Sequence, residues 1–372
     1  MANKRIYYAV HSVSFAPIGT ASASFNATHV AHGVQSVGVT VSFNLEQIFE
    51  LGQLSIYENI ENIPNIEMTV EKVLDGYSPV YCLATRGATS VTLGGRSNVK
   101  TIGALAIFDD TQDAASGTPI SLSLMSGLFI NNISYSFPVD GSFTESVSLV
   151  GNNKTFTASA PSAFSAYGSA FNNGGDVPKA IYGSGGVNRR EDLLLPQYSD
   201  LPSGLGADVN GQVNTNLWTV LPQDIDGIDA SGINPKVGDD YTAHLQSISV
   251  STSLGRTELF ELGRRGPYHR FANFPTEVTC EISTIGVRGD NIIATESGTL
   301  GDGNNLTNRT IKIVAREGLY LNLGTKNKLA SVSYTGGNAG TGGGNVIVTY
   351  NYSNFNDLTV YHPDDPSAFV RP

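Results

Sequence analysis

The sequence predicts a mainly β protein made of two copies of one fold. Three observations predict it: charged residues make up only 15% of the 372 residues, glycine occurs 41 times, and apolar residues alternate with polar ones along several stretches. Few charges, many turn formers and many β-branched or aromatic residues favour strands joined by turns. With 40% apolar residues, each half is able to bury a core of its own.

The duplication is visible in two segments that lie 211 residues apart. Residues 35–57 read QSVGVTVSFNLEQIFELGQLSIY, and residues 246–268 read QSISVSTSLGRTELFELGRRGPY. They share nine identities in 23 positions, where composition alone gives about one or two. The identical pairs are Gln35/Gln246, Ser36/Ser247, Val39/Val250, Ser42/Ser253, Phe49/Phe260, Glu50/Glu261, Leu51/Leu262, Gly52/Gly263 and Tyr57/Tyr268. We therefore expect a first domain over residues 1–155, an extended linker or arm over 156–240 and a second domain over 241–372.

Local patterns in the sequence predict the first secondary-structure elements of the chain. Residues 6–15, IYYAVHSVSF, predict a first strand. The next strand, from residue 35 to 43, places valines on one face and serine or threonine on the other. Residues 45–53, LEQIFELGQ, carry apolar residues at near-helical spacing with Gly52 at the end, which predicts a capped short helix or a loop at this point of each copy.

The following strand is the strongest geometric signal in the sequence. Between Ile66 and Val73 the side chains alternate, so that Glu67, Thr69 and Glu71 share one face. After one residue of slippage the second copy places Glu277, Thr279 and Glu281 at the same parity. The same face is therefore predicted to be polar in both copies.

A hairpin completes each copy. Residues 127–135 and 142–150 form it in the first copy, and residues 318–334 and 345–352 are the weaker echo in the second. The intervening residues 156–240 are rich in Gly, Pro, Asn and Asp, and NRREDLLLP, residues 188–196, predicts a short added strand there. Trp218, the one tryptophan, is expected to anchor this segment onto a domain.

Composition and motifs argue against several functions. The net charge of −11, from 22 basic and 33 acidic residues, argues against a protein that grips nucleic acid through its phosphates. Cys82 and Cys280 lie in apolar or alternating stretches and are expected to be buried free thiols. No run of 18 apolar residues predicts a membrane-spanning helix.

No catalytic constellation is found. His29 and His32 lack acidic or cysteine partners at zinc-ligand spacing, and the glycine-rich residues 336–345 join two strands instead of opening a helix. Asp224, Asp226 and Asp229 are expected to form a solvated turn, because their spacing does not match a calcium loop. We therefore expect no enzyme activity, no catalytic residues, no cofactor and no metal.

The residues quoted above resemble tail tube (major tail) proteins of tailed bacteriophages. The resemblance rests on QSVGVTVSFNLEQIFELGQLSIYENIENIPNIEMTVEKVLDG, on HLQSISVSTSLGRTELFELGRRGPYHRFANFPTEVTCEISTIGVRGD, and on NRREDLLLP with LPQDIDGI between them. It covers residues 35–80 and 185–290, and the hairpins more weakly. The family implies β-sandwich domains, each with a short flanking helix, whose inner sheets fuse into a barrel shared by a ring of subunits.

The resemblance also implies a function and partners. Such proteins stack rings into a tube that conducts DNA during ejection, and a duplicated chain resembles tubes in which three two-domain subunits make a pseudo-six-fold ring. The implied partners are the chain itself, the tail terminator, the tape measure and the baseplate proteins, in a virion tail assembled in the host cytoplasm, with no membrane. DNA passes without specific binding. The alternatives are another phage structural part, namely sheath, baseplate hub or capsid, or a receptor- or glycan-binding fibre domain.

Two sets of residues are candidates for function. Glu67, Thr69, Glu71, Glu277, Thr279 and Glu281 are predicted to line the lumen, where like charge keeps DNA off the wall. The second set lies in loop A, residues 44–65, and loop B, residues 255–276, which lie where rings stack in the family. Their charges have diverged, which predicts contacts between rings through Glu58, Glu61, Arg264, Arg265 and Arg270.

Overall fold

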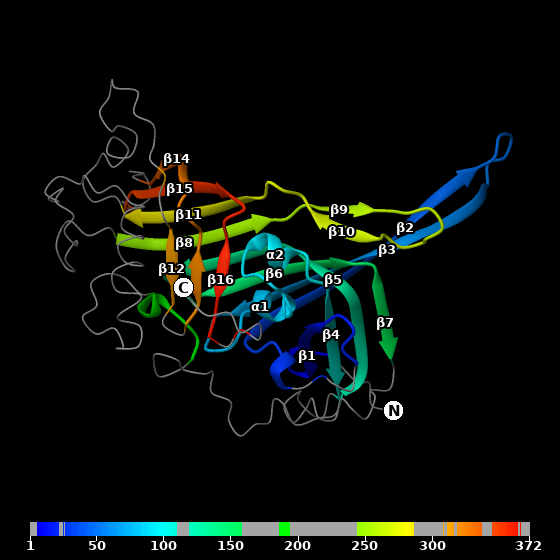
Figure 1. The fold of residues 1–372 in the computed structure, drawn as a ribbon, viewed down its shortest axis with the longest axis horizontal. Helices are drawn as coiled ribbons and strands as arrows, with labels where there is room; N and C mark the ends of the chain where they lie inside the picture. The colour runs from blue at the N-terminus through cyan, green and yellow to red at the C-terminus, as the bar shows by residue number, and fades with distance from the viewer. Residues whose placement is uncertain are drawn as a thin grey trace, which may run out of the picture.

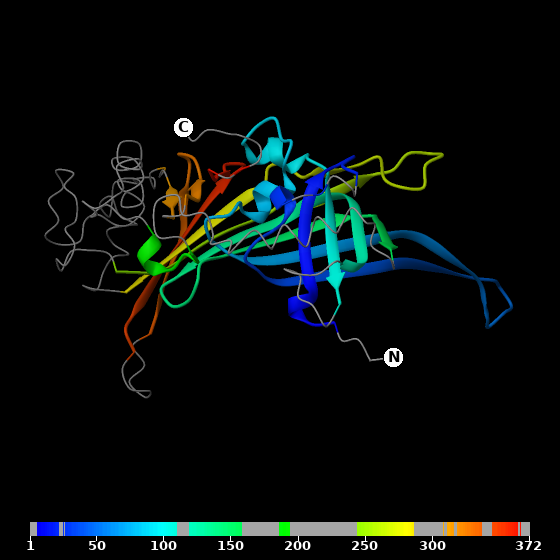
Figure 2. The ribbon, with the colours of Figure 1, turned by 90° about the horizontal axis from the view of Figure 1, so that it is seen from below.

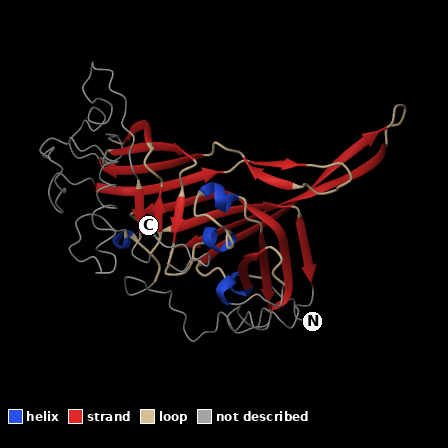
Figure 3. Cartoon of the chain, in the orientation of Figure 1, coloured by secondary structure: helices blue, strands red, loops and turns tan. Residues whose placement is uncertain are grey.

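The computed structural model describes residues 6–21, 25, 27–109, 119–157, 186–193, 244–285, 308, 311–315, 318–336, 344–363 and 365. These residues are mainly β, as predicted, with antiparallel strands and a few short helices (Figure 3). The linker beyond residues 186–193 falls outside them, and with it Trp218 and the aspartates of DIDGID. No helix among the described residues is long and apolar enough to span a membrane.

The first half of the chain supplies seven strands and two short α-helices. They are β1 (His11–Pro17), β2 (Val34–Phe49), β3 (Ile56–Val73), α1 (Val80–Ala84), α2 (Leu93–Ser97), β4 (Thr101–Phe108), β5 (Pro119–Pro138), β6 (Thr144–Gly151) and β7 (Asn153–Thr157). Single 3-10 turns lie at Tyr8–Val10 and Ala27–His29. Of the expected first strand over residues 6–15, only the part from His11 onward is a strand.

The second half supplies nine strands among its described residues. They are β8 (His244–Ser253), β9 (Arg256–Leu259), β10 (His269–Ala272), β11 (Glu277–Ile285), β12 (Lys312–Val314), β13 (Tyr320–Asn322), β14 (Lys328–Thr335), β15 (Ile347–Phe355) and β16 (Thr359–Tyr361). Of the strand predicted over NRREDLLLP, residues 188–193 are described, and they contain a 3-10 turn, Arg190–Asp192, and a single bridge from Leu193 to Ala315; residues 194–196 lie outside the described part.

One sheet runs through both halves of the molecule (Figures 1 and 2). Its strand order is β14-β15-β11-β8-β5-β6-β3-β2, and every neighbouring pair is antiparallel. We call these eight strands the main sheet. β5 leaves it at its N-terminal end, where it pairs with β4 and β7, and β1 pairs with β4.

The main sheet contains each repeat in the same order. Read from one edge, the first repeat contributes β2, β3, β6 and β5, and the second contributes β8, β11, β15 and β14. The two repeats meet where β5 pairs with β8. Two separate tandem sandwich domains are therefore not confirmed, because the halves share a sheet and one hydrophobic core.

The register of the two repeats differs by two residues. Val39 of β2 lies opposite Met68, whereas its counterpart Val250 of β8 lies opposite Cys280 instead of Val278. A slip of two residues leaves every side chain on its original face. The predicted parity is thus kept although the pairing has moved.

One face of the main sheet is buried and the other is open. Val70, Ile133, Val250 and Val278 point into the shared core, whose other members include α1 and the three-stranded sheet β12-β13-β16. A smaller core lies under β1 and β4. Both cysteines are buried free thiols, as expected.

The helix predicted at residues 45–53 is wrong. Residues 45–49 belong to β2 and pair with β3, and residues 51 and 52 form the turn between the two strands. In the second repeat the matching residues 256–264 contain the whole of β9 and the turn that follows it. A helix gains its stability by burying an apolar face, and Leu45, Phe49 and Leu51 are all exposed here, so strand pairing prevails over helix propensity.

Candidate functional site

The open face of the main sheet, which we call the polar face, carries an unbroken row of polar side chains. Each member of the row lies directly opposite the next on the neighbouring strand. From β2 to β14 the row reads Ser36, Glu71, Ser146, Ser134, Ser251, Thr279, Ser353 and Lys328. A row that stays polar across eight strands and both repeats is typical of a face that stays wet.

Short hydrogen bonds link neighbours on this face. Ser36 donates to the Glu71 carboxylate at 3.3 Å, and the hydroxyls of Ser251 and Thr279 lie 2.8 Å apart. Asn351 of β15 donates to Ser331 of β14 at 3.0 Å. Since these groups bond to one another along the sheet, the face is held together without any apolar cover.

All six predicted lumen residues lie on this polar face. Glu67, Thr69 and Glu71 are exposed on β3, and Glu277, Thr279 and Glu281 are exposed on β11. Three strands, β6, β5 and β8, separate the two sets. A hollow of about 650 Å³ lies between them, bordered by Glu67, Thr69, Ser134, Ser251, Glu277 and Thr279 among others. The alternation in the sequence correctly predicted which face of each strand is polar, and the shared sheet brings both sets of residues to one surface.

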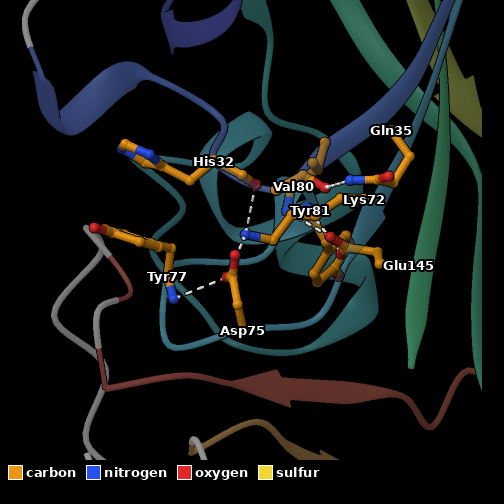
Figure 4. Close-up of polar contacts among 9 residues, drawn as sticks. His32, Gln35, Lys72, Asp75, Tyr77, Val80, Tyr81 and Glu145 are labelled. Carbon is orange, nitrogen blue, oxygen red and sulfur yellow. Dashed lines mark hydrogen bonds and ion pairs between the residues drawn. The ribbon is translucent and has the colours of Figure 1, made fainter. Parts of the chain in front are cut away.

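The core face of the same sheet holds a buried polar network that sequence reasoning missed (Figure 4). Glu145 of β6 is fully buried and accepts hydrogen bonds from the backbone N–H groups of Val80 at 2.6 Å and Tyr81 at 3.1 Å, and from the Tyr135 hydroxyl at 2.9 Å. Burial raises the pKa of Glu145, and these hydrogen bonds with the charge of Lys72 oppose the rise. The carboxylate thus caps the start of α1.

Lys72 extends this network to the segment before β2. Its ammonium donates to the His32 carbonyl at 2.9 Å and to Asp75 at 2.8 Å, and Asp75 also accepts from the Tyr77 N–H at 3.0 Å. Lys72 is 0% exposed, and the row of buried groups faces α1, so we assign it to holding the fold. The sequence does contain a sign of this network. Lys72 and Glu145 stand at alternating positions with Val70 and Val147, which places them on the apolar face of their strands.

Loops A and B are hairpins that leave the main sheet at one end (Figure 1). Loop A continues β2 and β3 beyond the core, and loop B forms the separate pair β9-β10. Both present large apolar side chains to solvent, listed here with their exposed fractions: Leu45 58%, Phe49 61%, Leu51 103%, Leu54 104% and Tyr57 64% in loop A, and Phe260 60%, Leu262 106%, Tyr268 51% and Phe274 45% in loop B. Monomeric proteins rarely expose a patch of this kind unless a partner covers it.

The predicted charged contacts fall into two groups. Glu58, Glu61, Arg264 and Arg265 are exposed, and Arg265 donates to the Glu61 carbonyl of the same chain at 3.5 Å. Arg270 is only 5% exposed and bonds within its own chain, to Glu258, Asn65 and Asn152. Of the three arginines, Arg264 and Arg265 are therefore exposed and Arg270 is not.

A second arginine, the half-buried Arg256, connects loop B to the first repeat. Arg256 donates to the carbonyls of Ile130 at 2.8 Å and Ser97 at 2.6 Å. Burial lowers the pKa of its guanidinium to about 10, and the charge of Arg270 adds to the effect. Arg96 of α2 is paired in the core with Asp365 near the chain's end. These contacts tie the two repeats together outside the main sheet.

The described residues hold no cluster of three or more His, Cys, Asp or Glu placed to bind a metal ion. Comparison with known proteins finds no matching family model and no matching curated protein. Among solved structures, the chain is similar to a component of the sheath–tube complex of an extracellular contractile injection system, PVC, in its extended state. That similarity has 13% identity, covers 42% of this chain and 94% of the other, and has a TM-score of 0.30.

Proposed function

We propose that this chain is a structural protein of a phage tail tube, which assembles into rings by pairing the free edges of its main sheet. The observation that carries the proposal is the strand order. β2 starts the first repeat and β14 ends the second, and neither has a second partner among the described strands. Their counterparts in the other repeat, β8 and β5, are paired with each other inside the chain.

Joining β14 of one chain to β2 of the next repeats the β5–β8 join. Exposed edges otherwise invite uncontrolled pairing, and a closed ring removes them. The join is heterologous, so it generates a ring if the rotation closes. Three chains then contribute six repeats, which gives a pseudo-six-fold ring, and the rings stack into a tube.

The polar face becomes the wall of the channel in this assembly. Glu67, Glu71, Glu277 and Glu281 then face the lumen, and their charge repels the phosphates of passing DNA. The wall offers hydroxyls and carboxylates, which suits passage without specific binding. Terminator, tape measure and baseplate proteins are the partners that such a tube requires.

Cysteine cross-linking tests the edge pairing. Single cysteines are placed at Gly38, Thr40 or Ser42 of β2 and combined with single cysteines at Ser331, Ser333 or Thr335 of β14. We expect at least one combination to give disulfides between chains, with a ladder on a non-reducing gel that stops at three chains. Ladders that stop at six or that continue indefinitely contradict the trimer, and the absence of any cross-link between chains contradicts the edge pairing.

A matched control uses the join that the chain already contains. Ser134 and Ser251 lie directly opposite each other on β5 and β8. A cysteine pair at these positions is expected to cross-link within one chain and to leave the gel mobility near that of a monomer. Negative-stain electron microscopy of the unmodified protein then shows whether rings and tubes form.

A further inference from the structure

Loops A and B end in the same tight turn. Gln53 donates its N–H to the Glu50 carbonyl at 3.2 Å, and Arg264 donates to the Glu261 carbonyl at 3.3 Å. The third residue of each turn is a glycine with positive φ, 95° at Gly52 and 82° at Gly263. A positive φ at the third position is the requirement of a type II turn, so the turn explains the glycines.

The turn does not explain the leucine before each glycine. Leu51 and Leu262 occupy the second position, which accepts most residues. Their side chains are 103% and 106% exposed, so neither contributes to the core of this chain. A side chain added at either neighbouring glycine meets nothing within 4 Å, which shows that both tips stand in open space.

The identities between the two repeats gather at these tips. Phe49 and Phe260 are 61% and 60% exposed, and Tyr57 and Tyr268 are 64% and 51% exposed. The two residues after each glycine have diverged: Gln53 and Leu54 in loop A correspond to Arg264 and Arg265 in loop B. Exposed apolar residues that stay identical between otherwise divergent loops point to binding.

We propose that Leu51 and Leu262 are paired anchors that insert into a second copy of this chain in the next ring. This inference rests on the proposed self-assembly. Two identical anchors need two alike receiving surfaces, and a chain built from two copies of one fold offers its surfaces in pairs. The charges agree with a self-contact, because loop A carries four glutamates and no base. Loop B also carries Glu258 and Glu261 but exposes Arg264 and Arg265 at its tip.

The anchors are tested by truncating them. Leu51→Ala and Leu262→Ala are each expected to raise the protein concentration needed for tube formation by about tenfold, because burying a leucine instead of an alanine contributes about that factor to association. The double variant is expected to raise it by about a hundredfold. Sedimentation of polymer over a concentration series measures the threshold, and electron microscopy shows whether single rings persist.

Leu54 supplies the matched control. It is 104% exposed beside the same turn, and its counterpart in loop B is Arg265, so it is not a paired residue. Leu54→Ala is expected to change the threshold by less than about twofold. An effect of Leu54→Ala as large as that of Leu51→Ala overturns the proposal, since nonspecific hydrophobic association then accounts for the contact.

The outcomes separate the anchors from the proposed function. Wild-type protein that never polymerises overturns both. Wild-type protein that polymerises, with a double variant of unchanged threshold, overturns the anchors alone. All variants should keep the wild-type circular dichroism spectrum and unfolding midpoint, because the truncated side chains lie in solvent; a variant that unfolds earlier contradicts the solvent exposure on which the proposal depends.

Discussion

The two repeats differ most in one row of residues on the core face of the main sheet. In the first repeat the row is Lys72, Glu145 and Tyr135, and it continues into the second repeat as Val250, Cys280, Tyr352 and Leu329. The first three are charged or hydrogen-bonded groups in a dry core, and the others are mainly apolar. Neighbouring positions of one sheet are thus stabilised differently, by buried hydrogen bonds in the first repeat and by apolar packing in the second.

The difference follows from what covers each part of the sheet. In the first repeat α1 supplies Val80 and Tyr81, whose backbone N–H groups have no partner within the helix. Glu145 satisfies them. In the second repeat the cover includes β12, β13 and β16, which pair with one another and bury Ile313, Leu321 and Val360. Paired strands satisfy their own backbone groups, so an apolar row suffices there.

Removing Glu145 from the buried row of Lys72, Glu145 and Tyr135 should have the largest effect on the free energy of unfolding. Glu145→Leu is expected to lower the free energy of unfolding by about 3 to 5 kcal/mol, because it leaves two N–H groups and the Tyr135 hydroxyl without their acceptor and removes the negative charge near Lys72. Cys280→Val, in the apolar row, should cost under about 1.5 kcal/mol. Urea denaturation at a protein concentration without polymer measures both, and equal losses would contradict the contrast between the rows.

Removing the partner at the edge of the network should cost less. Lys72→Met is expected to lower the free energy of unfolding by about 2 to 3 kcal/mol, because Asp75 stays buried but keeps its bond from the Tyr77 N–H. The same denaturation assay measures the loss. A loss larger than that of Glu145→Leu would show that Lys72, and not Glu145, contributes most to the stability of the network.

The smallest expected effect is a dependence on pH. Burial raises the pKa of Glu145 above its ordinary 4.5. At a pH above 4.5 but below the raised pKa, the folded state keeps the proton that the unfolded state has released. The contribution of Glu145 to stability therefore falls as pH rises through this window, by at most about 1.4 kcal/mol per pH unit. Glu145→Gln should lack this dependence. Parallel curves for wild-type and variant protein across the window would rule it out.

Strand existence and strand parity were predictable from the sequence because they depend on local alternation. The exposure of Glu67 and Glu277 and the burial of Cys280 followed from that alternation alone, whereas the burial of Cys82 in α1 followed from the apolar stretch around it. The hairpin form of loop A was not predictable, since LEQIFELGQ has near-helical spacing and its strand partner lies in β3. The β5–β8 join was also hidden, because Ser134 and Ser251 alternate in the same way whatever strand lies beside them.

The assignment of the six polar-face residues to a channel stays a prediction, as does the domain division at residues 155 and 241. Sequence parity placed Glu71 and Thr279 on a polar face, but only the continuous sheet makes them members of one row. The contacts of Arg270 were equally out of reach, because Asn65 and Asn152 lie more than a hundred residues away along the chain. Non-local pairing is the information that a local pattern does not contain.

The β5–β8 join also has a kinetic consequence for a protein that assembles by repeating it. A chain with two repeats makes half of its repeat-to-repeat joins while it folds, at the high effective concentration of two tethered partners. Closing a ring of six repeats then takes two encounters between molecules instead of five, because the last join of the ring forms within one complex. In the proposed ring, the covalent link between the repeats therefore replaces three associations that would otherwise depend on protein concentration.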